Sequence, residues 1–198
     1  ISDEVMSGWG RTGKWFAVDN WGVTPDIITT AKGITSGYVP LGAVIVSDKI
    51  AEYFEDKYLY AGLTYNGHAL ACAAALATIE VYDEDNLIEN AVTMGNYLGE
   101  CLEDIKSRHV SVGDVRYIGL FSTIELVSNR ETKEIFAPSV MGEVGKVLRE
   151  NGLFTFIMAN SMGSMVFVVP PLCITKEQLD EGLALVEKAL EVADAKIS

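Results

Sequence analysis

The sequence has few of the residues that build metal centres or disulfide frameworks. Its three cysteines lie far apart in apolar stretches, and neither of its two histidines has a carboxylate nearby at metal-ligand spacing. We therefore expect no metal site, and free, buried thiols in place of disulfides. The cysteines are Cys72, Cys101 and Cys173, and the histidines are His68 and His109.

Positive charge is also scarce. There are 15 basic residues against 28 acidic ones, for a net charge of -13, which repels phosphate backbones and anionic membrane surfaces. No apolar run approaches the roughly 20 residues of a membrane span, and the first residues lack a signal-peptide pattern. We expect a cytoplasmic protein with neither nucleic acid nor membrane as a partner.

The chain does have enough apolar sequence for a core, with 49% hydrophobic residues in a chain of 198. Short apolar runs at 26–30 and 41–46, bounded by Gly and Pro, predict buried strands, and the stretches 7–13 and 33–40 predict loops. The chain begins at Ile1, in what reads as the end of a strand, so we expect it to be a fragment.

Helical periodicity begins after Gly67. Residues 69–82 are nearly all small or apolar and predict a helix buried on most sides, and an amphipathic helix is predicted over 87–105. Strands are predicted within 115–127 and 165–169, a helix over 140–150, and a last helix whose capping box is Thr175 to Gln178. The alternation favours an α/β or α+β architecture, with a boundary near 82–86. The first piece is too small to close its own sheet and should belong to a larger one.

One familiar motif is rejected on its context. Gly8-Trp9-Gly10-Arg11-Thr12-Gly13 fits the G-x-G-x-x-G pattern of dinucleotide sites. However, the next residues contain Gly22 and Pro25 and no helical stripe, and no acidic residue lies about 20 positions on. A glycine-rich loop around another ligand, or a surface turn, remains.

Three residues suggest chemistry on a flat cationic ring. In a strand, Asp3 and Val5 would share one face, where a carboxylate could hold a protonated pyridine nitrogen and the apolar group could pack on the ring. Lys32 ends an apolar strand and precedes Gly33, and a lysine withdrawn from water is a good imine-forming nucleophile. Taken singly, such a lysine is more often an exposed turn residue, and Asp3 a solvated one.

The complete pattern is more specific. It comprises Asp3-Glu4-Val5, then Gly8 to Gly13, then Pro25-Asp26-Ile27, Ala31-Lys32-Gly33 and Gly37 to Ala43. This pattern closely resembles the signature of class III (omega-type) pyridoxal-phosphate-dependent aminotransferases, and the resemblance spans nearly all of the chain. Leu63 to His68 resembles the family segment whose threonine reaches the cofactor phosphate of the neighbouring subunit. Thr64 matches that threonine, although a hydroxyl that caps the next helix is equally plausible.

The resemblance implies a role for each matching residue. Lys32 would form the Schiff base with pyridoxal 5'-phosphate and then move the substrate proton, Asp3 would pair with the pyridine nitrogen, and Val5 would pack on the ring. Thr64 would serve a phosphate across a homodimer interface. The implied fold is the C-terminal part of a type I pyridoxal-phosphate transferase, an α/β fold. Residues 1–84 would end the large cofactor-binding domain, and residues 85–198 would form the small C-terminal domain.

The chain departs from the family pattern in two places. The family's N-terminal half, with its phosphate-binding loop, is absent, so the chain alone should be inactive. Many members also carry an arginine after the Gly-Leu that matches Gly152-Leu153, whereas Phe156 and Met158 stand here and no arginine follows Arg149. We expect the parent enzyme to transfer an amino group from an ω-amino compound to pyruvate or 2-oxoglutarate. An aminomutase, racemase or decarboxylase on the same scaffold, or a non-catalytic truncated fragment, are the alternatives.

Overall fold

The computed structural model describes residues 1–197, which divide into two compact units. The first unit is Ile1–Ala91 and the second starts at Val92, so the division falls inside one helix, α3 (Leu87–Arg108). The sequence pattern set the boundary slightly earlier, after residue 84, and that assignment to two domains stays a prediction. No helix within residues 1–197 is long and apolar enough to cross a membrane.

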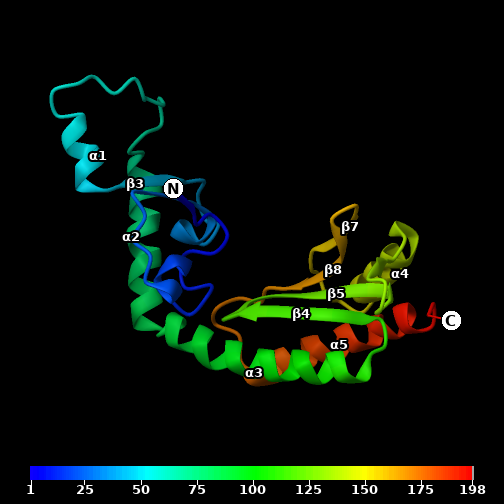
Figure 1. Ribbon diagram of the computed structural model, residues 1–198. Helices are drawn as coiled ribbons and strands as arrows, with labels where there is room; N and C mark the ends of the chain where they lie inside the picture. Colours follow the sequence, from blue (N-terminus) through cyan, green and yellow to red (C-terminus); the bar gives the residue numbers. More distant parts are fainter. Residues whose placement is uncertain (198) are drawn as a thin grey trace. The chain divides into compact units, whose positions relative to one another are not determined.

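The first unit is built on a small sheet of order β1-β2-β3 (Figure 1). The strands β1 (Ser2–Asp3) and β2 (Ile27–Thr30) are parallel, and β3 (Ala43–Val46) is antiparallel to β2. Strands are therefore present within both predicted ranges, 26–30 and 41–46, but the prediction that they are buried is wrong for β3. Val44 and Ile45 of β3 point to opposite faces of the sheet, and both are exposed, at 66% and 44%. Both faces of this strand are therefore left uncovered by residues 1–197. An apolar strand of this kind is typical of a sheet that is covered on both sides.

Helix α2 (Ala69–Glu84) corrects one prediction. It was expected to be buried on most sides, but only Ala71, Ala75 and Tyr82 are buried, while Leu70 and Leu76 are each 64% exposed. The reason is that the described elements pack on one side of α2, around the short 3-10 helix η2 (Lys32–Thr35). A second 3-10 helix, η1 (Ala17–Trp21), and α1 (Asp48–Tyr53) complete the unit.

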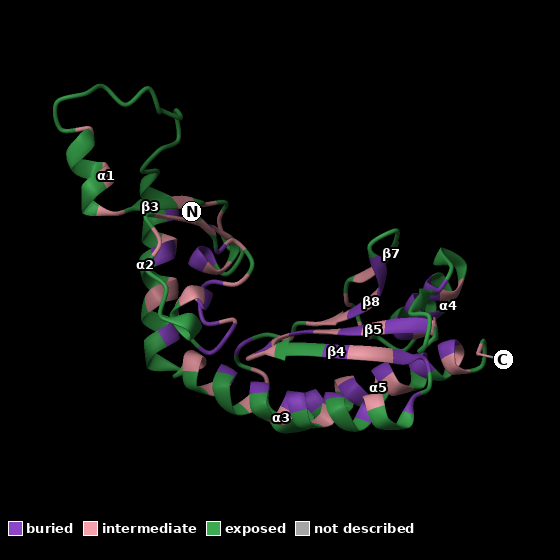
Figure 2. Cartoon of the chain, in the orientation of Figure 1, coloured by how far each residue is buried: buried purple, intermediate pink, exposed green. Residues whose placement is uncertain are grey.

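The segment between α1 and α2 is exposed throughout residues 55–70 (Figure 2). It carries large apolar and aromatic side chains, and Tyr58, Tyr60 and Tyr65 are 76%, 93% and 78% exposed. Several exposed aromatic side chains within one segment are unusual for a surface that has no partner, so this segment has the character of a contact region.

The second unit has an antiparallel sheet of order β4-β5-β8-β7. Its strands are β4 (Val112–Ile118), β5 (Phe121–Asn129), β7 (Ile157–Asn160) and β8 (Gly163–Val168), and the short β6 (Glu134–Ile135) pairs with β5. The later part of α3 and α5 (Lys176–Asp194) lie along one face of this sheet, and α4 (Pro138–Glu150) packs against α5 and β7 (Figure 1). Neither β6 nor β7 was predicted.

The amphipathic patterns of α3 and α5 are confirmed by burial. Leu98, Leu102 and Ile105 of α3 are at most 1% exposed, and α5 buries Leu179, Leu183, Val186 and Leu190. The capping box at Thr175 is present, since its hydroxyl accepts from Gln178 N and the Gln178 side chain accepts from Thr175 N.

Helix α3 also comes very close to the β4–β5 hairpin. A Cβ added at Gly95 would lie 2.5 Å from the backbone of Gly119. One turn later, a Cβ at Gly99 would lie 2.3 Å from the Tyr117 ring. Gly95 lets the helix lie against the backbone of the hairpin, and Gly99 leaves room on the helix for the Tyr117 ring.

The end of α5 is tied to the connection between α3 and β4. Asp194 Oδ2 lies 2.7 Å from Nδ1 of the buried His109, and Asp194 Oδ1 accepts from Ser111 N at 2.9 Å. Burial disfavours the charged carboxylate, but the hydrogen bonds from Ser111 and His109 together hold the pKa of Asp194 below its usual range.

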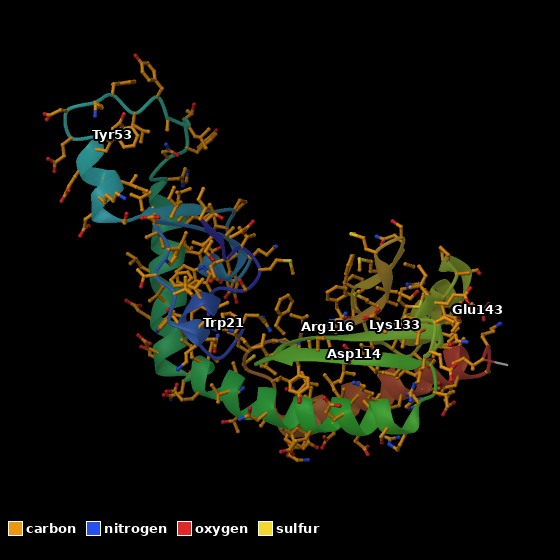
Figure 3. The ribbon with its side chains drawn as sticks, in the orientation of Figure 1. Trp21, Tyr53, Asp114, Arg116, Lys133 and Glu143 are labelled. Carbon is orange, nitrogen blue, oxygen red and sulfur yellow. The ribbon has the colours of Figure 1, made fainter. Side chains whose placement is uncertain are left out.

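Ion pairs on the surface of this unit join neighbouring elements. Arg108 binds Glu187 through two hydrogen bonds of 2.8 and 2.7 Å, which depress the pKa of Glu187. On β4, the side chains of Asp114 and Arg116 lie two residues apart on one face, and Arg116 also reaches Glu125 of β5 at 2.7 Å (Figure 3). These pairs are partly exposed, so each contributes little to stability by itself.

The prediction of buried thiols is wrong for this chain. All three cysteines are free, but Cys72 and Cys173 are exposed and Cys101 is partly exposed. Cys72 lies on the uncovered side of α2, and Cys173 lies in the connection between β8 and α5. Apolar neighbours in the sequence did not reveal which side of the helix was covered.

Candidate functional site

The candidate residues Asp3 and Lys32 follow the carboxyl ends of two neighbouring parallel strands. In the register of β1 and β2, Asp3, the last residue of β1, pairs with Thr29, and Lys32 lies three residues after Thr29, separated from the end of β2 by Ala31. In open α/β sheets, ligands bind at the carboxyl ends of parallel strands. The topology therefore brings an acid and an amine to the edge where a ligand site is expected.

Lys32 has an unusual backbone conformation. Its φ is 46°, in the left-handed region that a non-glycine residue rarely adopts, and it opens the 3-10 helix η2. Such a conformation costs about 1 to 3 kcal/mol and is often found at functional sites. Within residues 1–197 the Lys32 side chain is exposed and has no hydrogen bond or ion pair. The predicted withdrawal of this amine from water is therefore not provided by residues 1–197.

Asp3 is fixed by its own turn. Its Oδ1 accepts from the backbone N of Val5 at 3.0 Å, which bends the chain directly after β1. The prediction had placed Asp3 and Val5 on one face of a continuous strand, but β1 ends at Asp3 and Val5 lies in a turn. The basis of that argument is wrong, while the assignment of Val5 to the ring stays a prediction.

Glu4, which the sequence reasoning did not select, organises the loop beside Asp3. It is only 1% exposed, and its Oε2 accepts from Ser7 Oγ at 2.5 Å and Ala17 N at 3.1 Å. Its Oε1 accepts from Val18 N at 3.0 Å. A buried carboxylate with three donors fastens the start of η1 to the end of β1. The adjacent Asp3-Glu4 pair is the only sequence signal for it, since successive residues of an extended chain point to opposite sides.

Trp9, Trp15 and Tyr82 form an aromatic cluster that contacts the end of β2. Trp9 Nε1 donates to Thr30 Oγ1 at 2.6 Å, and the Trp9 and Trp15 rings lie 6.3 and 5.6 Å from the Tyr82 ring. Burial raises the pKa of Tyr82, with Ser36 and Arg11 opposing that shift. The same burial lowers the pKa of the Arg11 guanidinium. Tyr82 comes from α2, so this cluster joins the helix to the strand end.

The glycine-rich motif has a structural reason. A Cβ at Gly8 would lie 2.8 Å from the carbonyl oxygen of Glu4, and Gly13 N donates to Gly10 O at 2.9 Å. The motif forms turns and no α-helix opens at Gly13, since the next element is the 3-10 helix η1. The rejection of a dinucleotide fingerprint is confirmed on this point.

Thr64 is separate from the other candidates. It lies in the exposed segment 55–70, which loops away from the β1–β3 sheet (Figure 1). It does not cap the next helix, because α2 begins at Ala69 with His68 as its N-cap. The alternative explanation of Thr64 as a capping residue is therefore wrong.

Comparison with known proteins gives consistent matches along the chain. A family model for class-III aminotransferases matches residues 1–190. The putrescine–pyruvate aminotransferase of Pseudomonas aeruginosa is 36% identical over 100% of this chain and 43% of its own length. The taurine–pyruvate aminotransferase of Bilophila wadsworthia is 36% identical over 99% of this chain and 45% of its own length.

Solved structures agree on the fold. The taurine:2-oxoglutarate aminotransferase of Bifidobacterium kashiwanohense, solved in complex with PLP and glutamate, is 44% identical and has a TM-score of 0.93. The alignment covers 99% of this chain and 44% of that one. The predicted α/β fold, part of a pyridoxal-phosphate transferase, is confirmed. The chain spans less than half the length of the relatives that it matches.

Proposed function

Because this chain belongs to the class-III aminotransferases, we propose that the whole protein containing it transfers an amino group from an ω-amino compound to a keto acid. Pyruvate or 2-oxoglutarate is the proposed acceptor, as in the names of the relatives. The observation that carries the proposal is that the exposed Lys32 amine on a strained turn and Asp3 lie at the carboxyl ends of the paired strands β2 and β1.

The proposed cofactor is pyridoxal 5'-phosphate, and the two side chains fit it by their chemistry. An aldehyde needs an amine with no competing partner, and a pyridine nitrogen needs a carboxylate to hold its proton. Asp3 offers the carboxylate from the end of β1, and Lys32 offers the amine from the turn that follows the adjacent β2. When bound, the cofactor supplies an electron sink that makes the hydrogen on the substrate's reacting carbon acidic.

Lys32 would act in two ways. Its Nζ would be the group that holds the cofactor covalently, through the cofactor's aldehyde carbon. When it is not bonded to the cofactor, the Lys32 amine would hold and move the proton of the substrate's reacting carbon. Asp3 would accept the hydrogen bond of the pyridine N–H, and Val5 would pack on the ring.

A second copy of the chain is the proposed partner. The exposed segment 55–70 carries Thr64 among aromatic side chains that have the character of a contact region. In a homodimer with shared sites, the Thr64 hydroxyl would donate to the cofactor phosphate of the neighbouring subunit. This supports a site that is complete only in the assembled protein.

The substrate proposal is an amine without a carboxylate next to the reacting carbon. A carboxylate is best bound bidentately by arginine, and no arginine follows Arg149. Phe156 and Met158 occupy the corresponding region, and Phe156 is 65% exposed. Putrescine and taurine, for which two relatives are named, both lack a carboxylate at that carbon.

Covalent trapping tests the proposal. Reduction of the cofactor-loaded whole protein with borohydride, followed by peptide mapping, should place the pyridoxyl group on Lys32. Lys32→Ala should remove the label and the turnover, whereas Lys14→Ala, which changes another exposed lysine of the same unit, should keep both. A pyridoxyl label on Lys14 or Lys49 would contradict the assignment.

The 198 residues by themselves should hold the cofactor weakly and show no useful turnover. The phosphate needs several donors that orient the ring, and Thr64 is only one of them. Titration of this chain with cofactor, followed by absorbance, and an assay of alanine formation from pyruvate check this. Turnover comparable to that of a full-length relative would show that the site is more complete than we propose.

A further inference from the structure

The turn at Lys32 and Gly33 packs against two aromatic side chains, those of Trp9 and Tyr82. A Cβ at Gly33 would lie 2.5 Å from Trp9 Cβ and 3.1 Å from Tyr82 Oη. There is therefore no room for a side chain at Gly33, and the backbone of the turn lies directly on these two residues. Trp9 is itself fixed by its hydrogen bond to Thr30, the last residue of β2.

In addition to this packing, one hydrogen bond fixes the turn. Tyr82 Oη donates to the carbonyl oxygen of Gly33 at 3.1 Å, across 49 residues of sequence. The same carbonyl accepts from Ser36 N at 3.2 Å, within η2. Tyr82 is only 4% exposed and belongs to α2, so its hydroxyl has little freedom to move.

This contact matters because the backbone of Lys32 is strained. A left-handed φ persists only when the surroundings hold it, and the residue that follows Lys32, Gly33, carries the carbonyl that Tyr82 binds. A rotation about the backbone bonds of Gly33 would shift the adjoining Lys32 backbone and so change the direction in which the Lys32 side chain leaves the turn. A lysine that must reach a carbon atom in reactive geometry is sensitive to such a change.

We propose that Tyr82 is a positioning residue, whose hydroxyl holds the Gly33 carbonyl and so directs the amine of Lys32 toward the cofactor. The inference rests on the proposed function, because it assumes that Lys32 is the lysine that binds the cofactor. It assigns no contact between Tyr82 and the cofactor or substrate.

The test compares two single-hydroxyl deletions in the whole protein. Tyr82→Phe keeps the ring and its packing but removes the donor to Gly33. Tyr97→Phe is the control, because it also removes a hydrogen-bonded hydroxyl, the one that binds Asp180 in the second unit. The rate at which added pyridoxal phosphate condenses with Lys32 in the cofactor-free protein is followed by absorbance and by borohydride labelling. The half-reaction with amine donor alone and the melting temperature are measured in parallel.

Tyr82→Phe should slow both the condensation and the half-reaction by about three- to tenfold, as the loss of one neutral hydrogen bond implies, with donor binding unchanged. Tyr97→Phe should leave both rates as they are. If Tyr82→Phe lowers only the melting temperature, its role is structural and the inference fails. If the wild-type label is not on Lys32, the proposed function fails instead, so the two failures are distinguishable.

Discussion

Replacing Glu4 by Gln should release the loop that Glu4 fastens to the end of β1. The two side chains have the same shape, but an amide has one acceptor oxygen where the carboxylate has two. If that oxygen takes the place of Oε2, the donors of Ser7 and Ala17 are satisfied and Val18 N is left facing an NH2 group. If it takes the place of Oε1, Ala17 N is left without an acceptor.

Either orientation therefore leaves at least one backbone N–H unpaired in a site where Glu4 is 1% exposed. A buried unpaired donor costs about 1 to 3 kcal/mol, which would raise the population of the open loop by about 5- to 150-fold. Limited proteolysis measures this population, because trypsin cleaves after the exposed Lys14 once the loop opens.

A matched control is Asp19→Asn. Asp19 is exposed, and its Oδ2 accepts from Phe16 N at 3.3 Å at the start of the same 3-10 helix. Water can replace that bond, so cleavage after Lys14 should change little. Equal cleavage rates in wild type, Glu4→Gln and Asp19→Asn would refute the view that Glu4 anchors this loop.

Three further predictions concern the second unit and the substrate. Gly95→Ala should destabilise the protein by about 1 to 3 kcal/mol, because the new Cβ meets the Gly119 backbone, while Gly182→Ala in α5, where nothing lies within 4 Å, should stabilise it by up to about 1 kcal/mol. Thermal melts of both variants check the sign of each effect. The Arg108–Glu187 pair should stabilise the fold above pH 4.5, the ordinary pKa of Glu, and lose this effect as the pH falls through the depressed pKa of the folded state, so Glu187→Gln should flatten the acid side of a melting-temperature profile. In an assay with pyruvate, the whole protein should accept amine donors without a carboxylate at the reacting carbon, and loss of activity on all such donors would count against the substrate proposal.

Elements with strong internal patterns were predictable from the sequence. The stripes of α3 and α5 repeat at helical spacing, and Thr175 with Gln178 marked the start of α5. Strand β7 was missed because Ile157 to Asn160 has no alternation and is defined by its pairing with β8. The burial of α2 was overestimated, since an alanine-rich helix carries no signal for which side is covered.

The candidate site was predictable only where neighbours in sequence stay neighbours in space. Lys32 and Asp3 could be selected because Asp3 ends β1 and Lys32 follows the end of β2 by two residues, and the parallel pairing then brings them to one edge. Glu4 and Tyr82 could not be selected, because their importance comes from contacts with residues 13 and 49 positions away. Sequence order holds little information on such long-range hydrogen bonds.

The contact between Asp194 and the α3–β4 connection also bears on how the second unit folds during synthesis. His109 and Asp194 are 85 residues apart, so the chain must close a long loop before this contact forms. The face of the sheet that α5 covers stays open to water until residues 176–194 have left the ribosome. Contacts of such large sequence separation slow folding, and partly made units of this kind expose apolar surface. We therefore expect the nascent second unit to depend on chaperones until its last helix is released.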